Sequence, residues 1–324
     1  MKIAIIASNN GLGHIKRCSI VANKVCKRNT VHFFCCKKKV KKFKINKKVK
    51  IIDFPIDIDY EKFFFDLYWV NRLKKFSMYD LYYSDNLPGI IKLKKKTIIY
   101  ANFFWHQISK YANKKKINEI NNLINTSNAK FVSWNAFGKI DLFKKTFHRK
   151  VGMVGNIQKN INYKKRKHVL LSFGTAKNIE KKNIINFLKS RYFLRFTKNF
   201  KVFIDELYYK HCLYKNVYIA THNDQMFKKT YIAIIRPGLG IVTDCIKWKI
   251  KMLTYVKNQN KEFKMNSKIL KKKLIGVQFS SLIKALNYIK TYKNNKDNFS
   301  IISRRQKTIS LNGEKEIARL INEF

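Results

Sequence analysis

The sequence predicts an α/β protein with two doubly wound, Rossmann-like domains that face a cleft. The chain has 324 residues, more than a typical single core, so about two domains are expected. Short apolar runs alternate along it with stretches of helical spacing, which is typical of doubly wound parallel sheets. Each half also opens with an apolar run that leads into a loop of small residues, at 2–13 and at 168–176.

The first half begins with a predicted strand, loop and helix. The run KIAIIAS at 2–8 is short and rich in β-branched residues, as expected for a buried parallel strand. After a glycine loop, apolar residues recur at helical spacing between Ile15 and Val25. The later apolar runs predict further strands within 30–36, 49–56, 80–91, 97–104 and 129–135.

A polar and basic stretch at 152–167 interrupts the apolar periodicity. We therefore predict an N-terminal domain over 1–158 and a C-terminal domain over 159–324. The last residues, 314–324, carry one apolar helix face, so this helix can pack back on the N-terminal domain. The second half predicts strands within 168–176, 200–206, 216–223, 231–240 and 251–257.

The charge balance is strongly basic, with 70 Lys and Arg against 19 Asp and Glu and a net charge of +51. Such a charge suits nucleic acid or an anionic membrane surface. Alternatively it reflects composition, because the abundant Lys, Asn and Ile have A/T-rich codons and the lysines are spread along the whole chain. No RNP motif, zinc-finger spacing or basic zipper accompanies them. We therefore favour compositional bias over specific nucleic-acid binding, and peripheral contact with an anionic membrane stays open.

The sequence shows no membrane-spanning or export signal. Its apolar runs are broken within about a dozen residues, well short of the roughly 20 that span a bilayer, and the N-terminus has no signal-peptide pattern. The six cysteines form no CxxC pair and no cluster with metal-ligand spacing, which is typical of thiols in a reducing compartment. These features predict a cytoplasmic protein, which can associate with the inner face of the membrane, and no bound metal or cofactor.

The loop GLGHIKR at 11–17 is the first candidate site. Glycines after a first strand allow a ligand to approach closely, and the helix N-terminus that follows favours an anion. The pattern lacks the third glycine and the ribose-binding acid of a dinucleotide site, so NAD binding is disfavoured. His14 stands at the start of the helix, where the positive end of the dipole favours a neutral imidazole that can accept a proton. The alternative is a histidine that only caps the turn.

The stretch RPGLGIVTD at 236–244 is the second candidate site, and it again joins a strand, a glycine loop and a helix. Its helix N-terminus can hold a diphosphate. The segment NQNKEFKMN at 258–266 follows, and its Gln259, Glu262 and Asn266 can bind ribose and sugar hydroxyls. The alternative is an ordinary strand-to-helix turn followed by a solvated helix.

Together the two stretches resemble the two halves of the GT-B glycosyltransferases, above all the MurG-like group of family 28. The N-terminal GLGHIKRC also resembles the UDP-sugar hydrolase of pseudaminic acid synthesis, which has the same fold. DLYYSDNLPGII at 80–91 and HNDQMFKKTYIAIIRPGLG at 222–240 resemble further segments of these proteins in the same order. The resemblance covers most of the chain and implies an acceptor-side domain followed by a nucleotide-sugar donor domain.

The resemblance also implies roles for individual residues. His14 would be the general base that deprotonates an acceptor or water, and Asp85 would assist it or bind the acceptor. Gly11, Gly13 and Arg17 would line the acceptor side, with Arg17 near an anionic group. The glycine loop of the second domain would hold the donor diphosphate in place of a metal. The donor-binding residues would be Ser172, Gly174, Thr175, Arg236, Gly238, Gly240, Thr243, Asp244, Gln259, Glu262 and Asn266.

The implied activity is metal-independent transfer of a sugar, with inversion, from a nucleotide donor to a glycan or lipid-linked acceptor. The donor is expected to be UDP-linked, and the pathway to build cell-surface polysaccharide. A nucleotide-sugar hydrolase or epimerase on the same fold is the first alternative, and a basic nucleic-acid-binding protein is the second. Three departures from the family pattern put the donor site in doubt: Asp244 replaces a longer Glu, 249–251 replaces Gly-x-Pro, and Phe263 replaces an amide.

Overall fold

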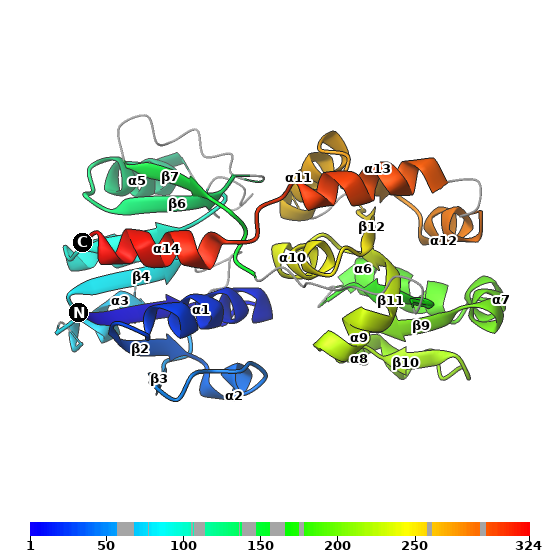
Figure 1. Cartoon of the computed structure of the whole chain (residues 1–324), viewed down its shortest axis with the longest axis horizontal. Coiled ribbons are helices and arrows are strands. Elements are labelled where there is room, and N and C mark those ends of the chain that lie inside the picture. The colour runs from blue at the N-terminus through cyan, green and yellow to red at the C-terminus, as the bar shows by residue number, and fades with distance from the viewer. Residues whose placement is uncertain are drawn as a thin grey trace. The chain divides into compact units, whose positions relative to one another are not determined.

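The computed structural model describes residues 1–56, 68–76, 78–104, 106, 114–135, 137, 147–155, 166–174, 178–257, 261–291 and 296–324. The chain forms two compact units, and each is an α/β layer structure around one parallel sheet (Figure 1). The first unit contains Met1–Gly155 and Ser310–Phe324, and the second contains Asn156–Ile309. The predicted α/β class with two parallel-sheet domains is confirmed.

The first unit has a seven-stranded parallel sheet in the order β3-β2-β1-β4-β5-β6-β7. The chain builds outward from β1 to β3 and then returns to place β4 on the other side of β1. This reversal creates a topological switch point, and ligands of such sheets bind at the carboxyl ends of the strands there. The strands are β1 (Lys2–Ala7), β2 (Thr30–Cys35), β3 (Val49–Asp53), β4 (Leu81–Asp85), β5 (Thr97–Tyr100), β6 (Lys130–Trp134) and β7 (His148–Val151).

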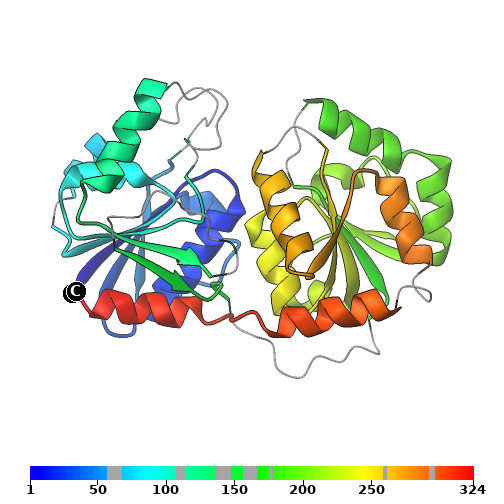
Figure 2. The same ribbon diagram turned by 90° about the horizontal axis from the view of Figure 1, so that it is seen from above.

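Helices cover both faces of this sheet. Figure 2 shows α14 on one face and α5 on the other. A core of Ala4, Ile6 and Phe34 from the strands and Trp69 and Leu73 from α3 lies between the sheet and its helices. The helices of the first unit are α1 (Leu12–Val25), α2 (Lys37–Val40), α3 (Tyr68–Lys74), the 3₁₀ helix η1 (Pro88–Leu93), α5 (Lys114–Asn125) and α14 (Gly313–Asn322).

The second unit has a six-stranded parallel sheet in the order β10-β9-β8-β11-β12-β13, with its switch point between β8 and β11. Its strands are β8 (His168–Ser172), β9 (Lys201–Ile204), β10 (Val217–Ile219), β11 (Thr230–Ile235), β12 (Lys251–Tyr255) and β13 (Gly276–Phe279). Its helices are α6 (Asn178–Leu188), α7 (Arg191–Asn199), α8 (Glu206–Tyr209), α9 (Asp224–Lys229), α10 (Leu239–Lys247), α11 (Lys261–Lys272), α12 (Leu282–Lys290) and α13 (Lys296–Lys307).

The C-terminal helix α14 belongs to the first unit, where it packs on α1 and β7. Two of its carboxylates bind backbone N–H groups of the segment after β7: Glu316 accepts from Gly152 at 2.7 Å and Glu314 accepts from Gly155 at 3.1 Å. The main chains also approach closely, because Gly313 N donates to the Met153 carbonyl at 3.1 Å. The first unit therefore combines 1–155 with the last fifteen residues, which differs from a single division at residue 158.

Gly313 is expected to tolerate no side chain. A Cβ at this position would lie 2.0 Å from the Gly152 carbonyl oxygen, which is backbone and cannot swing away. We expect Gly313→Ala to lower the free energy of unfolding by about 2–3 kcal/mol, the usual cost of overpacking. Urea unfolding followed by circular dichroism measures it, with Lys315→Ala on the exposed side of α14 as the control. A Gly313→Ala variant as stable as that control would contradict the packing described here.

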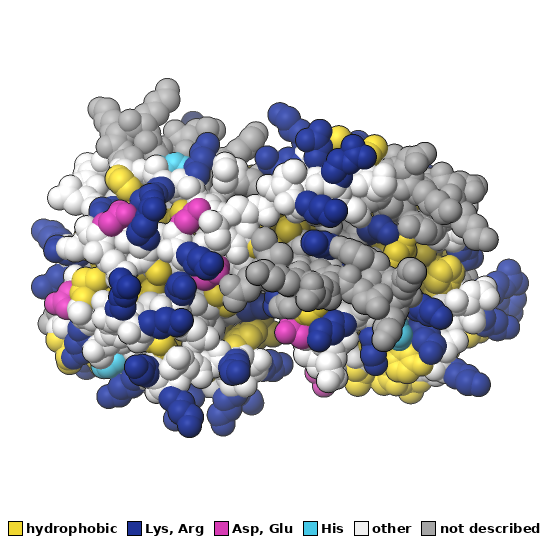
Figure 3. Space-filling view, in the orientation of Figure 1, with side chains coloured by type: hydrophobic (Ala, Val, Ile, Leu, Met, Phe, Trp, Pro, Cys, Tyr) yellow, Lys and Arg dark blue, Asp and Glu magenta, His cyan; other side chains and the backbone are white. Residues whose placement is uncertain are grey.

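On the visible face, Lys and Arg side chains are spread over both units and outnumber the Asp and Glu side chains (Figure 3). Within the described residues, no helix is long and apolar enough to cross a membrane.

Candidate active site

The first unit brings His14 and Asp85 together at the carboxyl edge of its sheet. Helix α1 starts directly after β1, with Gly11 as its N-cap at φ 84° and no side-chain cap. Asp85 is the last residue of β4, and β4 pairs with β1 so that Ala7 faces Asp85. His14 lies in the first turn of α1 and thus next to the end of β4. The glycine loop and the switch point together explain why residues 71 positions apart meet.

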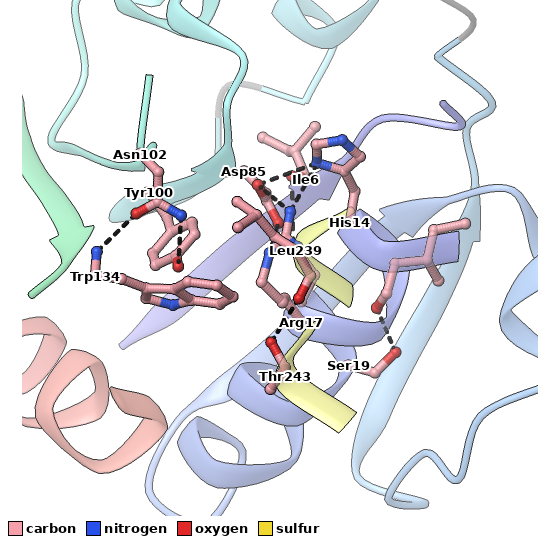
Figure 4. Close-up of polar contacts among 12 residues, drawn as sticks. Ile6, His14, Arg17, Ser19, Asp85, Tyr100, Asn102, Trp134, Leu239 and Thr243 are labelled. Atoms are coloured by element: carbon pink, nitrogen blue, oxygen red, sulfur yellow. Dashed lines mark hydrogen bonds and ion pairs between the residues drawn. The ribbon is translucent and has the colours of Figure 1, made fainter. Parts of the chain in front are cut away.

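The Asp85 carboxylate is shared by His14 and Arg17. His14 Nδ1 lies 3.1 Å from Asp85 Oδ1. Arg17 donates from Nε to Oδ2 at 2.9 Å and from Nη2 to Oδ1 at 3.2 Å. Arg17 Nη2 also lies 3.2 Å from His14 Nδ1, so the three side chains point toward one another (Figure 4).

The group is largely removed from solvent. The Asp85 side chain is 1% exposed and that of His14 is 13% exposed. Burial alone would raise the pKa of the Asp85 carboxyl, but the charges of Arg17 and His14 and their hydrogen bonds lower it. Asp85 is therefore ionised at neutral pH and accepts hydrogen bonds from both partners.

Aromatic rings and an amide hold the guanidinium in place. The Arg17 guanidinium carbon lies 5.7 Å from the centre of the Tyr100 ring and 5.9 Å from the Trp134 ring. Asn102 ties these residues together, since its Oδ1 accepts from Trp134 N at 2.7 Å and its Nδ2 donates to the Tyr100 hydroxyl at 3.4 Å. Tyr100, Asn102 and Trp134 were not predicted as site residues. The feature that could have predicted them is their position at, or just after, the ends of β5 and β6.

The arrangement can support proton transfer. When His14 is neutral, an ionised Asp85 can accept its Nδ1–H, and this tautomer leaves Nε2 as the nitrogen that accepts a proton. A histidine oriented by a carboxylate in this way can act as a general base toward a hydroxyl or a water. The predicted pairing of His14 with Asp85 is therefore present in the structure. Arg17 binds the same carboxylate.

The second unit places its glycine loop at the N-terminus of α10. Gly238 is the N-cap and provides no side-chain cap, so the first N–H groups of α10 are not satisfied by a capping side chain. Asn266 of α11 donates to the Pro237 carbonyl at 2.9 Å and fixes the loop from one side. Thr243 points back along its own helix, because its hydroxyl donates to the Leu239 carbonyl at 2.7 Å. Gly240 and the buried Asp244 lie on the same helix.

Arg236 precedes this loop and is held by three groups. Its Nη1 donates to the Phe173 carbonyl at 2.7 Å, and its Nε lies 2.9 Å from Glu180 Oε1. The guanidinium carbon lies 4.6 Å from the centre of the Phe263 ring. Phe263 departs from the family pattern, and its ring occupies the space beside Arg236. Arg236 is 8% exposed and connects the loops after β8 and β11.

The donors of the loop after β8 bind the Asp205 carboxylate. Phe173 N and Gly174 N donate to Asp205 Oδ2 at 2.6 and 2.7 Å, and the Ser172 hydroxyl donates to Oδ1 at 3.1 Å. His222 Nε2 lies 2.9 Å from the same Oδ1. Of these residues, Ser172 and Gly174 were expected beside a donor phosphate, so a phosphate here would have to share their donor groups with the Asp205 carboxylate or displace it.

The remaining predicted residues are placed as follows. Gly13 lies in the first turn of α1, and Glu262 lies in the first turn of α11. Thr175 and Gln259 lie outside the described residues. Asp205 and His222 were not predicted as site residues, although they lie near the ends of the predicted strands at 200–206 and 216–223. Among the residues that the structure describes, no group of three His, Cys, Asp or Glu side chains could hold a metal ion; the expected lack of a cofactor stays a prediction.

Solved structures with the same fold span the whole chain. A UDP-glucosyltransferase from Polygonum tinctorium aligns with a TM-score of 0.69 and 10% identity over 99% of this chain and 98% of its own. Phytolacca americana UGT2, complexed with UDP-2-fluoro-glucose and pterostilbene, aligns with a TM-score of 0.68 and 10% identity over 99% of both chains. A Streptomyces glycosyltransferase complexed with thymidine diphosphate aligns with a TM-score of 0.63 and 12% identity over 100% of both chains.

This chain has the GT-B fold. The predicted architecture is thereby confirmed, and the narrower resemblance to the MurG-like group of family 28 stays a prediction. No protein-family model matches the sequence, and a search of curated proteins gives no match. At 10–12% identity the structural likeness shows the fold, and the chemistry has to be argued from the residues of this chain.

Proposed function

We propose that the protein transfers a sugar from a nucleotide donor to a hydroxyl of a glycan or lipid-linked acceptor, with inversion and without a metal. The observation that carries this proposal is the His14–Asp85 pair at 3.1 Å, at the switch point of the first unit's sheet. A neutral histidine oriented by a buried carboxylate is the general base that such a reaction requires. The GT-B fold supports the proposal, because the proteins of similar structure named above include a UDP-glucosyltransferase and a Streptomyces glycosyltransferase.

The reaction is a single displacement. The acceptor hydroxyl gives its proton to His14 Nε2 while its oxygen attacks the anomeric carbon. The bond from that carbon to the diphosphate breaks, and the nucleoside diphosphate leaves with the electron pair. Because attack and departure occur on opposite faces, the configuration of the anomeric carbon inverts. The same displacement with water as acceptor would make the protein a nucleotide-sugar hydrolase.

The donor is proposed to bind to the second unit. The N-terminus of α10 presents N–H groups and the positive end of its dipole, which suit a diphosphate and stand in place of a metal. Gly238 and Gly240 would allow the phosphates to approach the backbone, and Asp244 and Glu262 would bind ribose and sugar hydroxyls. UDP is the proposed nucleotide. Contact of the basic surface with an anionic membrane is proposed as the route to a lipid-linked acceptor.

A panel of nucleotide sugars in a thermal-shift assay tests the proposal. A bound donor stabilises the folded protein by RT ln(1 + [L]/Kd), about 2.7 kcal/mol at 100 times Kd. We expect a UDP-sugar to raise the melting temperature more than TDP-, GDP- or CMP-sugars do, and turnover to need an added acceptor. Stoichiometric UDP release without an acceptor would indicate the hydrolase. No stabilisation by any nucleotide sugar, together with salt-sensitive binding of random DNA, would replace the proposal with nucleic-acid binding.

A further inference from the structure

The Asp85 carboxylate has two basic partners, and the second of them, Arg17, has no place in a simple histidine–carboxylate pair. We propose that Arg17 is a positioning residue for the general base: it fixes the Asp85 carboxylate and offsets its charge, so that His14 is held in the neutral, proton-accepting form. The proposal rests on the proposed function for its catalytic meaning. The protonation of His14 that it concerns can be measured without any reaction.

The geometry commits Arg17 to Asp85. Its Nε and Nη2 donate to the two oxygens of one carboxylate, at 2.9 and 3.2 Å. A fork of two parallel bonds fixes both the position and the rotation of the carboxylate plane. Arg17 is only 8% exposed, and the Tyr100 and Trp134 rings flank its guanidinium. This placement gives Arg17 an indirect role in place of the expected contact with an anionic group of the substrate.

The charges explain why Arg17 matters for the protonation of His14. A buried carboxylate beside a lone imidazole favours the protonated imidazolium, which cannot act as a base. Arg17 supplies a permanent positive charge to the same carboxylate, and its Nη2 lies 3.2 Å from His14 Nδ1. The Arg17–Asp85 pair therefore presents close to zero net charge to the ring. The Asp85 carboxylate still accepts the Nδ1–H of His14 and thereby selects the tautomer. The charge of Arg17 offsets the tendency of this carboxylate to favour the imidazolium form.

The other titratable groups around the Arg17–Asp85 pair do not alter its charge balance. Cys18 on α1, Tyr83 on β4 and Tyr100 on β5 interact electrostatically with Asp85 or Arg17, and burial raises the pKa of each. They are uncharged at neutral pH. Lys39 of α2 donates to the Asn9 carbonyl of the neighbouring loop at 2.7 Å, and its charge is the same in every variant considered below.

Two substitutions separate charge from shape. Arg17→Gln removes the charge and retains a hydrogen-bond donor toward Asp85. Arg17→Lys retains the charge and loses the two-pronged contact. In Arg17→Gln we expect the pH at which His14 takes up a proton, followed by NMR of its ring protons, to rise by about one unit. The acid limb of kcat/KM should move up equally, with a loss of at most about three-fold at pH 7, up to about ten-fold at lower pH, and recovery at higher pH.

Arg17→Lys is expected to keep the acid limb within about 0.3 unit of the wild type and to lose activity evenly across pH, because the carboxylate is less firmly oriented. The inference is overturned if folded Arg17→Gln titrates like the wild type and loses activity equally at every pH. If Arg17→Gln fails to fold, Arg17→Lys decides: an acid limb that shifts upward, or activity unchanged at all pH values, overturns it. A His14 titration that shifts in a protein that transfers no sugar would sink the proposed function and leave this inference standing.

Discussion

Replacing His14 by alanine is expected to lower sugar transfer about 10³-fold, the usual contribution of a positioned general base. The loss should appear in kcat, because the imidazole acts on the acceptor proton as the bond forms and does not hold the donor. Nucleotide affinity should stay within about two-fold of the wild type. Initial rates at saturating acceptor and calorimetric titration with the nucleoside diphosphate measure the two effects separately.

His211→Ala is the matched control, because His211 lies in the second unit and interacts with neither candidate site in the described structure. Asp244→Ala should have the opposite effect and weaken nucleotide binding more than it lowers kcat. Equal loss of turnover and nucleotide binding in His14→Ala, with an unchanged melting temperature, would assign His14 to ligand binding. A wild-type rate would remove it from the reaction altogether.

The strands of both sheets were predictable from sequence except for one edge strand in each sheet. The inner strands carry nearly continuous apolar runs, such as KIAIIA in β1 and TYIAII in β11, because both of their faces are covered. The missed strands β7 and β13 are the outermost strands of their sheets. The sequence of β7 is HRKV and that of β13 is GVQF, so neither contains an apolar run that would predict a strand. Pairing with one neighbouring strand, which sequence does not show, creates these two strands.

Some features of the candidate sites were predictable from the sequence and others were not. His14 follows the predicted strand at 2–8, and Asp85 lies inside the predicted segment 80–91. Strand order at a switch point brings the end of β4 next to the start of α1. The direction of the Arg17 side chain was not predictable, because an arginine one turn after a histidine can face solvent or the sheet equally well. Asp205 was read as the end of a strand, since nothing in FKVFIDE shows that the loop after β8 turns its N–H groups toward it.

Replacing Asp205 by alanine is expected to destabilise the second unit. Its carboxylate accepts from Phe173 N, Gly174 N and the Ser172 hydroxyl, and it contacts His222 Nε2. Asp205→Ala would leave these donors without their acceptor, and Ser172 and Phe173 are buried residues while Gly174 is exposed. Each hydrogen bond to a charged group contributes about 1.5–3 kcal/mol, and partial solvation of His222 reduces the sum. We expect a loss of about 3 kcal/mol in the free energy of unfolding.

Hydrogen exchange followed by mass spectrometry can localise this loss, because the amides of Phe173 and Gly174 should exchange much faster in Asp205→Ala. Glu206→Ala removes an exposed carboxylate one residue away and serves as the control. Asp205→Asn should cost about 1 kcal/mol, since its amide oxygen can still accept from the two N–H groups while the charge is gone.

The asparagine variant also tests the predicted phosphate role of the loop. If Ser172 and Gly174 contact donor phosphates, removing the adjacent negative charge should tighten binding of the nucleoside diphosphate by about three-fold or more, since like charges repel. Unchanged affinity in a stable Asp205→Asn protein would mean that the loop serves only to hold Asp205, and the diphosphate would then be held by the N-terminus of α10 alone.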